Sequence, residues 1–151
     1  MGRIEKEIRE MKKNEPYYAE PDENDTSQWN GYVLGPEDTV YEGGKFLLTI
    51  VLPSDYPFSA PTVQFKTPVY HPNISESGAV CIDILKDQWS PALTLHAVLV
   101  SITSLLSDPN PDDPLVTTIA HQYIHNRKEF YKSARENTQK YAIVKENILT
   151  Q

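Results

Sequence analysis

Cysteine is nearly absent from this sequence: its 151 residues include only one, Cys81. A single cysteine cannot form an internal disulfide, so we expect a protein of the cytoplasm and nucleus rather than of an oxidising compartment. Long apolar runs are missing as well. The longest mostly apolar run, residues 97–106, is far too short to span a bilayer, and the N-terminus lacks the apolar core of a signal peptide. The sequence predicts a soluble protein without a membrane partner.

Positive charge is also scarce, because 14 lysines and arginines stand against 21 acidic residues and leave a net charge of −7. Phosphate contacts need clustered basic side chains, so this balance argues against nucleic acid as a partner. Residues 3–13 are an exception, with five basic residues and three acidic ones. This segment is either a solvated helix stabilised by i,i+3 and i,i+4 ion pairs or a basic surface for an acidic protein partner.

Motifs for metal binding, phosphate binding and hydrolysis are incomplete. His121 and His125 stand four residues apart, but no glutamate follows the first, and two ligands do not fill a zinc site. Gly43-Gly44 lacks the Gly-Lys-Ser/Thr ending of a phosphate loop and indicates a hairpin turn. A thiol protease built on His71 and Cys81 would need a partner that orients the histidine, and no obvious one is present. We expect neither a metal ion nor a bound cofactor.

The N-terminal half predicts one helix and an antiparallel meander. Ile4, Ile8 and Met11 recur at helical spacing, which predicts an amphipathic helix over residues 2–14 that ends before Pro16. A polar loop follows. Three strand-like runs, separated by glycines and prolines, come next at residues 29–34, 45–52 and 61–66. Strands this close along the chain favour antiparallel pairing with their neighbours.

The C-terminal half is mostly helical. Residues 94–107 carry a broad apolar face with Thr94 as N-cap, which predicts the core helix. Asp113-Pro114 resembles the N-cap and first turn of another helix. Asn126 with Glu129 forms a capping-box pattern for a last helix through about Asn147. The predicted fold is therefore α+β. It is a single domain over residues 1–151 with an N-terminal helix, a meander of about four strands, a core helix and two C-terminal helices.

The surroundings of Cys81 decide between two interpretations of its thiol. A lone cysteine is often a small buried apolar residue. Here a polar, turn-forming stretch precedes it and apolar residues follow, which predicts a thiol on a surface loop. Asp83 and Asp87 oppose a thiolate and only Lys86 nearby favours one. This setting is poor for attack on an amide, but it suits a thiol that accepts an acyl group from another thioester.

Several motifs stand in a specific order around this cysteine. His71-Pro72-Asn73 precedes it, and Trp89-Ser90-Pro91-Ala92-Leu93 follows it; Tyr56-Pro57-Phe58 lies upstream and residues 108–115 (DPNPDDPL) downstream. In order and spacing they resemble the catalytic core of the ubiquitin-conjugating enzymes, over residues 3–142. The sequence is most similar to the broad-acting subgroup that serves many RING, U-box and HECT ligases, judged by Phe58 and by residues 81–85 and 138–142.

Two segments depart from that subgroup. Residues 19–23 are similar to conjugating enzymes dedicated to one non-degradative chain linkage, which need a catalytically inactive variant partner. That specialist remains an alternative, as does a noncatalytic ubiquitin-binding scaffold. Residues 143–151 form a short C-terminal extension to which we assign no function.

The resemblance implies a reaction and a set of site residues. Cys81 would accept ubiquitin from an activating enzyme, which alone uses ATP and magnesium, and pass it with a ligase to substrate lysines or to a HECT cysteine. The implied catalytic residues are Cys81, Asn73, Asp113 and Asp83, with His71 and Pro72 as the structural motif of the site. Asn73 is either a donor to the oxyanion or a brace for its loop. Asp113 and Asp83 would orient the amine and receive its proton, and Asp113 is alternatively a helix N-cap.

Binding surfaces follow from the same resemblance. The implied ligase-binding residues are Arg3, Lys6, Phe58, Pro91 and Ala92. The implied contacts with the donor ubiquitin are Val100, Thr103 and Ser104. The expected partners of this monomeric enzyme are ubiquitin, the activating enzyme, RING, U-box or HECT ligases, and protein substrates.

Overall fold

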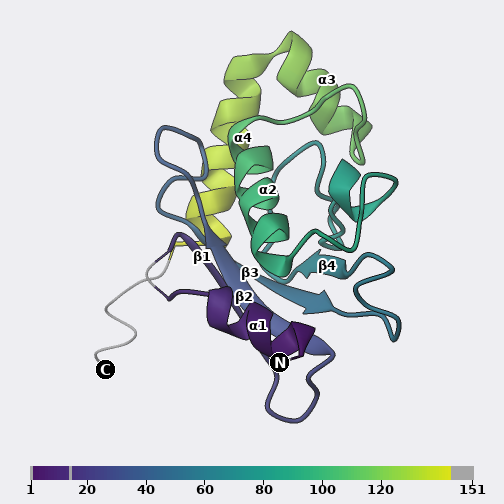
Figure 1. Cartoon of the computed structure of the whole chain (residues 1–151). Coiled ribbons are helices and arrows are strands. Elements are labelled where there is room, and N and C mark those ends of the chain that lie inside the picture. Colours follow the sequence, from purple (N-terminus) through teal and green to yellow (C-terminus); the bar gives the residue numbers. More distant parts are fainter. Residues whose placement is uncertain (1, 14, 144–151) are drawn as a thin grey trace, which may run out of the picture.

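The structure is a computed structural model that describes residues 2–13 and 15–143. In that part of the chain, four α-helices accompany a four-stranded sheet (Figure 1). The elements are α1 (Arg3–Glu10), β1 (Tyr17–Pro21), β2 (Gln28–Leu34), β3 (Lys45–Val51), β4 (Thr62–Phe65), the 3-10 turn η1 (Asp83–Leu85), α2 (Leu95–Ser107), α3 (Thr117–His125) and α4 (Arg127–Tyr141).

The sheet is the predicted antiparallel meander, with strand order β1-β2-β3-β4. In β3, Phe46, Leu48 and Ile50 point into the core while the residues between them face outward, which is the alternation expected of a half-buried strand. The sequence located three of the four strands. It missed β1, where Ala19 alone is buried and a proline ends the run. Such a strand is tolerated because β1 lies at the edge of the sheet and pairs with β2 only.

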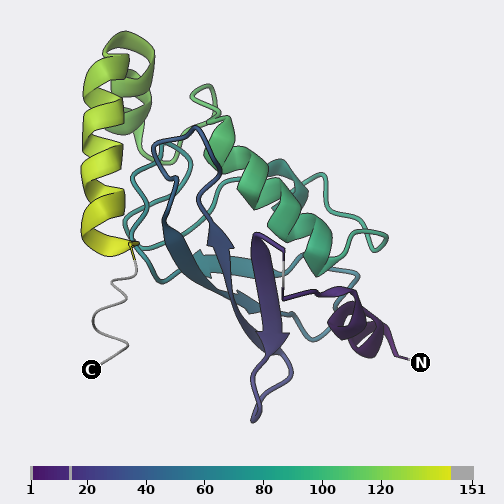
Figure 2. The same ribbon diagram turned by 90° about the vertical axis from the view of Figure 1, so that its left-hand side faces the viewer.

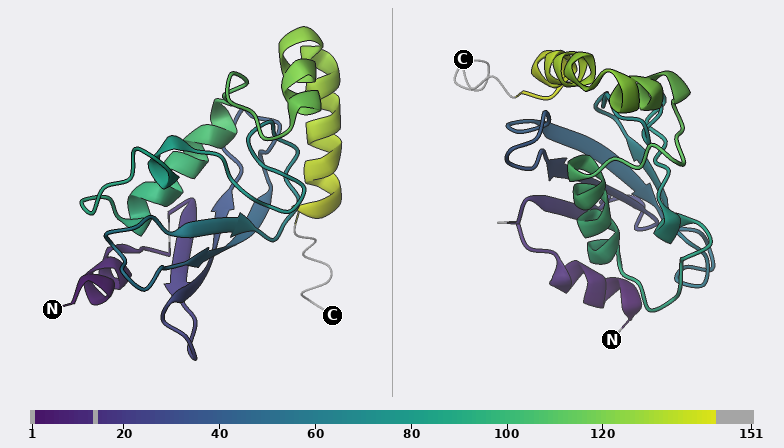
Figure 3. Two further views of the ribbon diagram at one scale, coloured as in Figure 1. Left: turned by 90° about the vertical axis from the view of Figure 1, so that its right-hand side faces the viewer. Right: turned by 90° about the horizontal axis from the view of Figure 1, so that it is seen from above.

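Helix α2 is the core helix that the sequence predicted. Most of its apolar residues are buried, and Leu95, Leu99 and Ile102 are fully so. Its N-cap is Thr94, whose hydroxyl accepts a hydrogen bond from the Ala97 amide at 3.1 Å. Figure 2 shows α2 lying along the sheet, with α1 at one end and the α3–α4 pair at the other. Helices α3 and α4 pack side by side (Figure 3).

The ends of two predicted helices differ in the structure. Helix α1 ends at Glu10 rather than at residue 14, because Met11 is already extended, with φ −79° and ψ 130°. Helix α4 ends at Tyr141, and the part of the prediction beyond Ile143 lies outside the described residues, as does most of the extension at 143–151. The capping box at Asn126 does not form: this residue is the junction of α3 and α4, and its side chain caps neither helix.

The prediction of a helix start at Asp113-Pro114 was wrong. Helix α3 begins at Thr117 with Val116 as its N-cap. The physical reason is a competing long-range contact, since the amides of Leu115 and Val116 both donate to the carbonyl oxygen of Pro72, at 2.9 and 3.0 Å. This segment therefore lies as turns and bends against the 71–73 loop, where it reaches the single cysteine.

Two further expectations concern the connections and membrane crossing. Gly43 lies in the connection between β2 and β3 with φ +83°, a conformation that glycine adopts readily, and this agrees with the predicted turn. Within residues 2–13 and 15–143, no helix is both long enough and apolar enough to cross a membrane.

Candidate active site

His71 anchors the loop that precedes the cysteine. Its ring is fully buried, its Nε2–H donates to the Leu105 carbonyl at 2.8 Å, and its Nδ1 accepts from the Asn73 amide at 2.9 Å. Burial lowers the pKa of His71 to about 4, because desolvation disfavours the charged ring. The ring is therefore neutral at pH 7 and holds the turn to the C-terminal part of α2.

Pro72 and Asn73 connect this loop to residues 110–116. Pro72 supplies the carbonyl that accepts from Leu115 and Val116. The buried Asn73 side chain donates from Nδ2 to the carbonyls of Asn110 (2.8 Å) and Asp113 (3.0 Å), and its Oδ1 accepts from the Asn110 amide at 2.9 Å. Both amide hydrogens are thus engaged. Of the two predicted roles, this geometry is that of the brace; an oxyanion donor would first have to release one of these bonds.

Cys81 lies where these two segments meet. Its amide donates to the Asn73 carbonyl at 2.9 Å, and its Sγ is 3.6 Å from both the backbone oxygen and Oδ2 of Asp113. The prediction of a thiol on a surface loop was wrong, since the residue is only 9% exposed. The reason is that residues 110–116, tied down by Pro72 and Asn73, pack against it.

Lys86 is the residue that the sequence reasoning undervalued. Its Nζ is 2.9 Å from Cys81 Sγ and 3.4 Å from Asp113 Oδ2. The hydrogen bond and charge of Cys81, followed by those of Asp113, raise the pKa of Lys86 above its ordinary value. The turn η1 lies between Cys81 and Lys86 and folds the chain back over five residues. A tight turn after the cysteine followed by a lysine was the available signal.

Asp83 stands apart from this cluster. It is exposed at the start of η1, where its backbone oxygen accepts from the amides of Lys86 and Gln88. Within the described residues, its carboxylate makes no hydrogen bond to Cys81 or Asp113. The structure therefore brings Cys81, Asn73 and Asp113 together, with His71 and Pro72 behind them, and leaves Asp83 beside the site.

The predicted ligase-binding residues are near one another but differ in accessibility. Phe58 is 76% exposed, as expected for a surface residue rather than a core one, and Pro91 and Ala92 are exposed. Their two loops are joined by a hydrogen bond from Trp89 Nε1 to the Pro57 carbonyl, at 2.9 Å.

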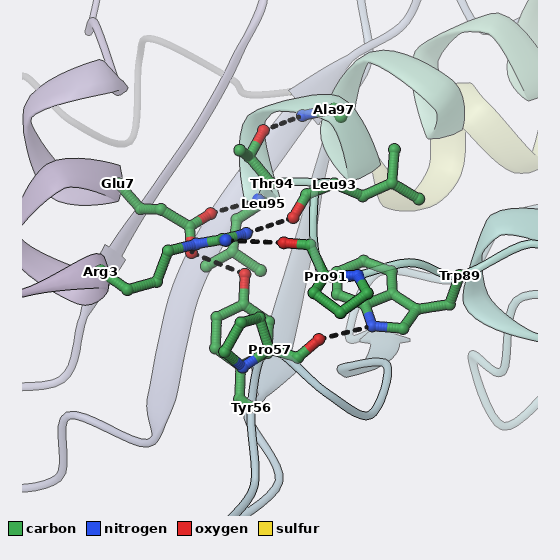
Figure 4. Close-up of polar contacts among 10 residues, drawn as sticks. All are labelled: Arg3, Glu7, Tyr56, Pro57, Trp89, Pro91, Leu93, Thr94, Leu95 and Ala97. Carbon is green, nitrogen blue, oxygen red and sulfur yellow. Dashed lines mark hydrogen bonds and ion pairs between the residues drawn. The ribbon is translucent and has the colours of Figure 1, made fainter.

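The two basic residues predicted for the ligase surface lie on α1. Lys6 is exposed. Arg3 instead directs its guanidinium into the protein, donating to the carbonyls of Pro91 (2.7 Å) and Leu93 and pairing with Glu7 (Figure 4).

The residues predicted to contact the donor ubiquitin lie away from the buried face of α2. Val100 and Ser104 are exposed, and Thr103 is half-buried with its hydroxyl bonded to the Leu99 carbonyl. Nowhere in the described part of the chain do three or more histidine, cysteine or acidic side chains gather as a metal site would require.

The fold thus holds the single cysteine, buried, beside a lysine and a carboxylate. The family model of ubiquitin-conjugating enzymes matches residues 3–138, and the chain belongs to that family. Among solved structures, it is similar to the E2 domain of a ubiquitin conjugating enzyme from Toxoplasma gondii. The TM-score is 0.87 with 42% sequence identity, and the match covers 93% of this chain and 97% of that one. The predicted α+β fold is confirmed.

Membership fixes the general activity. The protein is a ubiquitin-conjugating enzyme, a transferase that carries ubiquitin as a thioester and works between an activating enzyme and ubiquitin ligases.

Proposed function

We propose that Cys81 is the residue that carries ubiquitin, and that the enzyme passes it, with RING, U-box or HECT ligases, to substrate lysines or to a HECT cysteine. The observation that carries this proposal is the placement of the chain's one sulfhydryl between an ammonium and a carboxylate, 2.9 Å from Lys86 Nζ and 3.6 Å from Asp113 Oδ2. The ammonium favours the thiolate that thioester exchange uses, and the carboxylate suits proton transfer from an attacking amine.

In the first step, the Cys81 sulfur attacks the thioester carbonyl of ubiquitin on the activating enzyme. Cys81 gives its proton to solvent, a carbon–sulfur bond forms at Cys81, the bond to the activating enzyme breaks, and the released thiolate takes a proton from solvent. The thiolate is the attacking species, and an ammonium at hydrogen-bond distance stabilises negative charge on the sulfur. Exchange between similar sulfurs needs little additional driving force.

In the second step, a lysine amine of the substrate attacks the thioester at Cys81. The carbon–nitrogen bond forms, the carbon–sulfur bond breaks with its electron pair leaving on Cys81 as the thiolate, and the amine loses a proton. Free lysine has a pKa of about 10.4, so few amines are neutral at pH 7. The Asp113 carboxylate is 69% exposed and 3.6 Å from the sulfur, which supports a role in orienting the incoming amine and receiving its proton.

Asn73 enters this step through Asp113. Its side chain hydrogen-bonds the backbone at both ends of residues 110–113, and so fixes the segment that carries the Asp113 carboxylate. We assign Asn73 as a positioning residue. Asp83, exposed at η1 beside this cluster, stays a prediction as a second carboxylate for the incoming amine.

Partner choice is the finer part of the proposal. Phe58 and the 91–92 loop make a small exposed apolar surface, which fits the weak, transient contact of an enzyme that serves many ligases. A specialist for one chain linkage is the second candidate, favoured by residues 19–23. We further propose that the enzyme works as a monomer in the cytoplasm and nucleus and binds no cofactor itself, since the activating enzyme uses the ATP and magnesium.

A loading experiment tests the central assignment. Incubation with activating enzyme, ubiquitin, ATP and magnesium should add one ubiquitin that thiol reductant removes. Cys81→Ser should give a reductant-resistant oxyester, and Cys81→Ala should give no adduct. An adduct that persists in the alanine variant would contradict the assignment. Chain formation that depends on an added inactive variant partner would favour the specialist.

A further inference from the structure

Glu7 is a buried carboxylate that the reaction does not use. It lies on α1, is 2% exposed, and accepts hydrogen bonds on both oxygens. Its Oε1 accepts from the Leu95 amide at 2.6 Å, and its Oε2 accepts from the Tyr56 hydroxyl at 2.6 Å and from Arg3 Nε at 3.1 Å. Figure 4 shows this carboxylate between the helix, the Tyr56 ring and the start of α2.

The Leu95 bond joins Glu7 to the first residue of α2. Amides at a helix N-terminus lack acceptors inside the helix, and a carboxylate there is favoured by the helix dipole. Hydrogen bonds to a charged group are about twice as strong as neutral ones. Burial and the hydrogen bond to Glu7 raise the pKa of Tyr56 above its ordinary value, so the phenol stays protonated and donates to Glu7.

Arg3 extends the network to the loop before α2. Its guanidinium donates to the carbonyls of Pro91, at 2.7 Å, and Leu93, and it lies over the Tyr56 ring at 5.6 Å. The guanidinium nitrogens are thus directed at the protein itself. This use differs from the ligase contact that the sequence predicted for Arg3.

The two loops reached by this network carry the exposed residues of the proposed ligase surface. Tyr56 is two residues from Phe58, and Arg3 bonds the carbonyl of Pro91 itself. Neither loop is part of a helix or strand, so regular backbone pairing does not set their separation. They touch through the Trp89–Pro57 hydrogen bond and through the Tyr56 and Trp89 rings, whose centroids are 6.0 Å apart.

We propose that Glu7 and Arg3 are a positioning pair for ligase recognition: they hold the Phe58 loop and the Pro91–Ala92 loop at the spacing that a ligase binds. This inference rests on the proposed function and deepens it. Arg3 acts by holding the backbone of the surface, and Glu7 acts from beneath it without touching the ligase. The pair also ties α1 to both loops.

The test is Glu7→Gln, which keeps the side-chain shape and one acceptor for Leu95 but replaces the oxygen that serves Tyr56 and Arg3. We expect the ligase concentration for half-maximal discharge to rise about tenfold. Loading and ligase-free discharge onto lysine should stay within about twofold. Glu10→Gln, an exposed position on the same helix, is the matched control and should behave as wild type. Tyr56→Phe, which removes one donor and keeps the ring, should show the same effect more weakly.

A double variant and a readout without ligase complete the test. If Glu7 acts through the Phe58 loop, adding Glu7→Gln to Phe58→Ala should cause little further loss. Hydrogen exchange of residues 54–60 and of the Leu95 amide should be faster in Glu7→Gln and unchanged in Glu10→Gln.

Three results would overturn the proposal: unchanged ligase dependence in Glu7→Gln, parallel loss of loading and ligase-free discharge, or fully additive effects with Phe58→Ala. A wild-type enzyme that loads but responds to no ligase would instead contradict the proposed function, so the two failures are distinguishable.

Discussion

The ammonium nitrogen of Lys86 lies 2.9 Å from the sulfur of Cys81 and 3.4 Å from Oδ2 of Asp113. The sulfur, the ammonium and the carboxylate thus form a triangle in which each group lies within 3.6 Å of the other two. A carboxylate 3.6 Å from the sulfur opposes negative charge there, and Lys86 offsets that opposition. The balance among these three groups decides how reactive the thiol is.

Removal of the Lys86 charge should slow reactions of the free thiol. In Lys86→Gln, we expect alkylation of Cys81 by iodoacetamide at pH 7 to slow by about two- to fivefold, a modest effect because the lysine is half-exposed. Lys86→Arg should retain most of the rate, and Lys66→Gln, at an exposed position on another loop, is the control. Mass spectrometry follows the single cysteine directly. An unchanged rate in Lys86→Gln would mean that this contact does not activate the sulfur.

Asp113 should matter to amine attack and not to loading. Asp113→Ala should charge Cys81 at a near normal rate but discharge onto free lysine about 10²-fold more slowly in single-turnover assays. Higher pH should recover part of this loss, because alkali supplies the neutral amine that Asp113 helps to provide. A deficit that is the same at every pH would remove the assignment of Asp113 as proton acceptor.

A double variant distinguishes the role of Asn73 from that of Asp113. If Asn73 acts by holding residues 110–113, Asn73→Ala combined with Asp113→Ala should discharge about as slowly as the slower single variant. If Asn73 is an oxyanion donor, the two losses should multiply, and Asn73→Ala alone should cost about 10²- to 10³-fold. The geometry predicts the first result. Thermal melts must accompany the rates, since Asn73→Ala leaves buried backbone groups unpaired at a cost of about 1–3 kcal/mol.

Phe58→Ala should separate ligase use from chemistry. Because the ring is 76% exposed, we expect a change of less than about 0.5 kcal/mol in the free energy of unfolding. Ligase binding should weaken by about 2 kcal/mol or more, as is usual for an aromatic anchor, while loading stays normal. Leu47→Ala, an exposed apolar position on β3, is the matched control. A normal ligase titration for Phe58→Ala would place the ligase on another surface.

The buried His71 predicts a pH dependence of stability. Its folded-state pKa of about 4 lies below the ordinary value of 6.5, so the unfolded chain takes up the proton first as the pH falls. The neutral ring therefore contributes fully to the free energy of unfolding above pH 6.5. This contribution is lost as the pH falls from 6.5 to 4, and the loss is about 3 kcal/mol. Urea unfolding at pH 7.5, 6 and 5 measures it. His71→Gln should flatten the profile, and the exposed His121→Gln should not.

Prediction from the sequence worked best where neighbours along the chain decide the structure. The apolar face and Thr94 cap of α2 depend on spacings of three and four residues, and both are confirmed. Strands β2, β3 and β4 also agree with their predicted positions to within one residue at each end. Strand β1 was missed because it is an edge strand, which has one buried residue and tolerates Pro21, and so shows no apolar alternation. The family followed from short motifs in order, which is information that a linear sequence carries in full.

The functional geometry depended on contacts between segments far apart in the chain. Asp113 has the pattern of an N-cap. The Pro72 carbonyl, about forty residues earlier, instead accepts hydrogen bonds from the amides of Leu115 and Val116, and Asp113 therefore lies beside the Cys81 thiol. The spacing of Arg3 and Glu7 is that of an ordinary i,i+4 ion pair on a helix surface. Glu7 is nevertheless buried, because α2 and Tyr56 supply hydrogen-bond donors to its carboxylate. The sequence alone determined most of the elements and the class of chemistry. Only the tertiary structure decided what each polar side chain bonds to, because buried donors and acceptors must find partners wherever the fold places them.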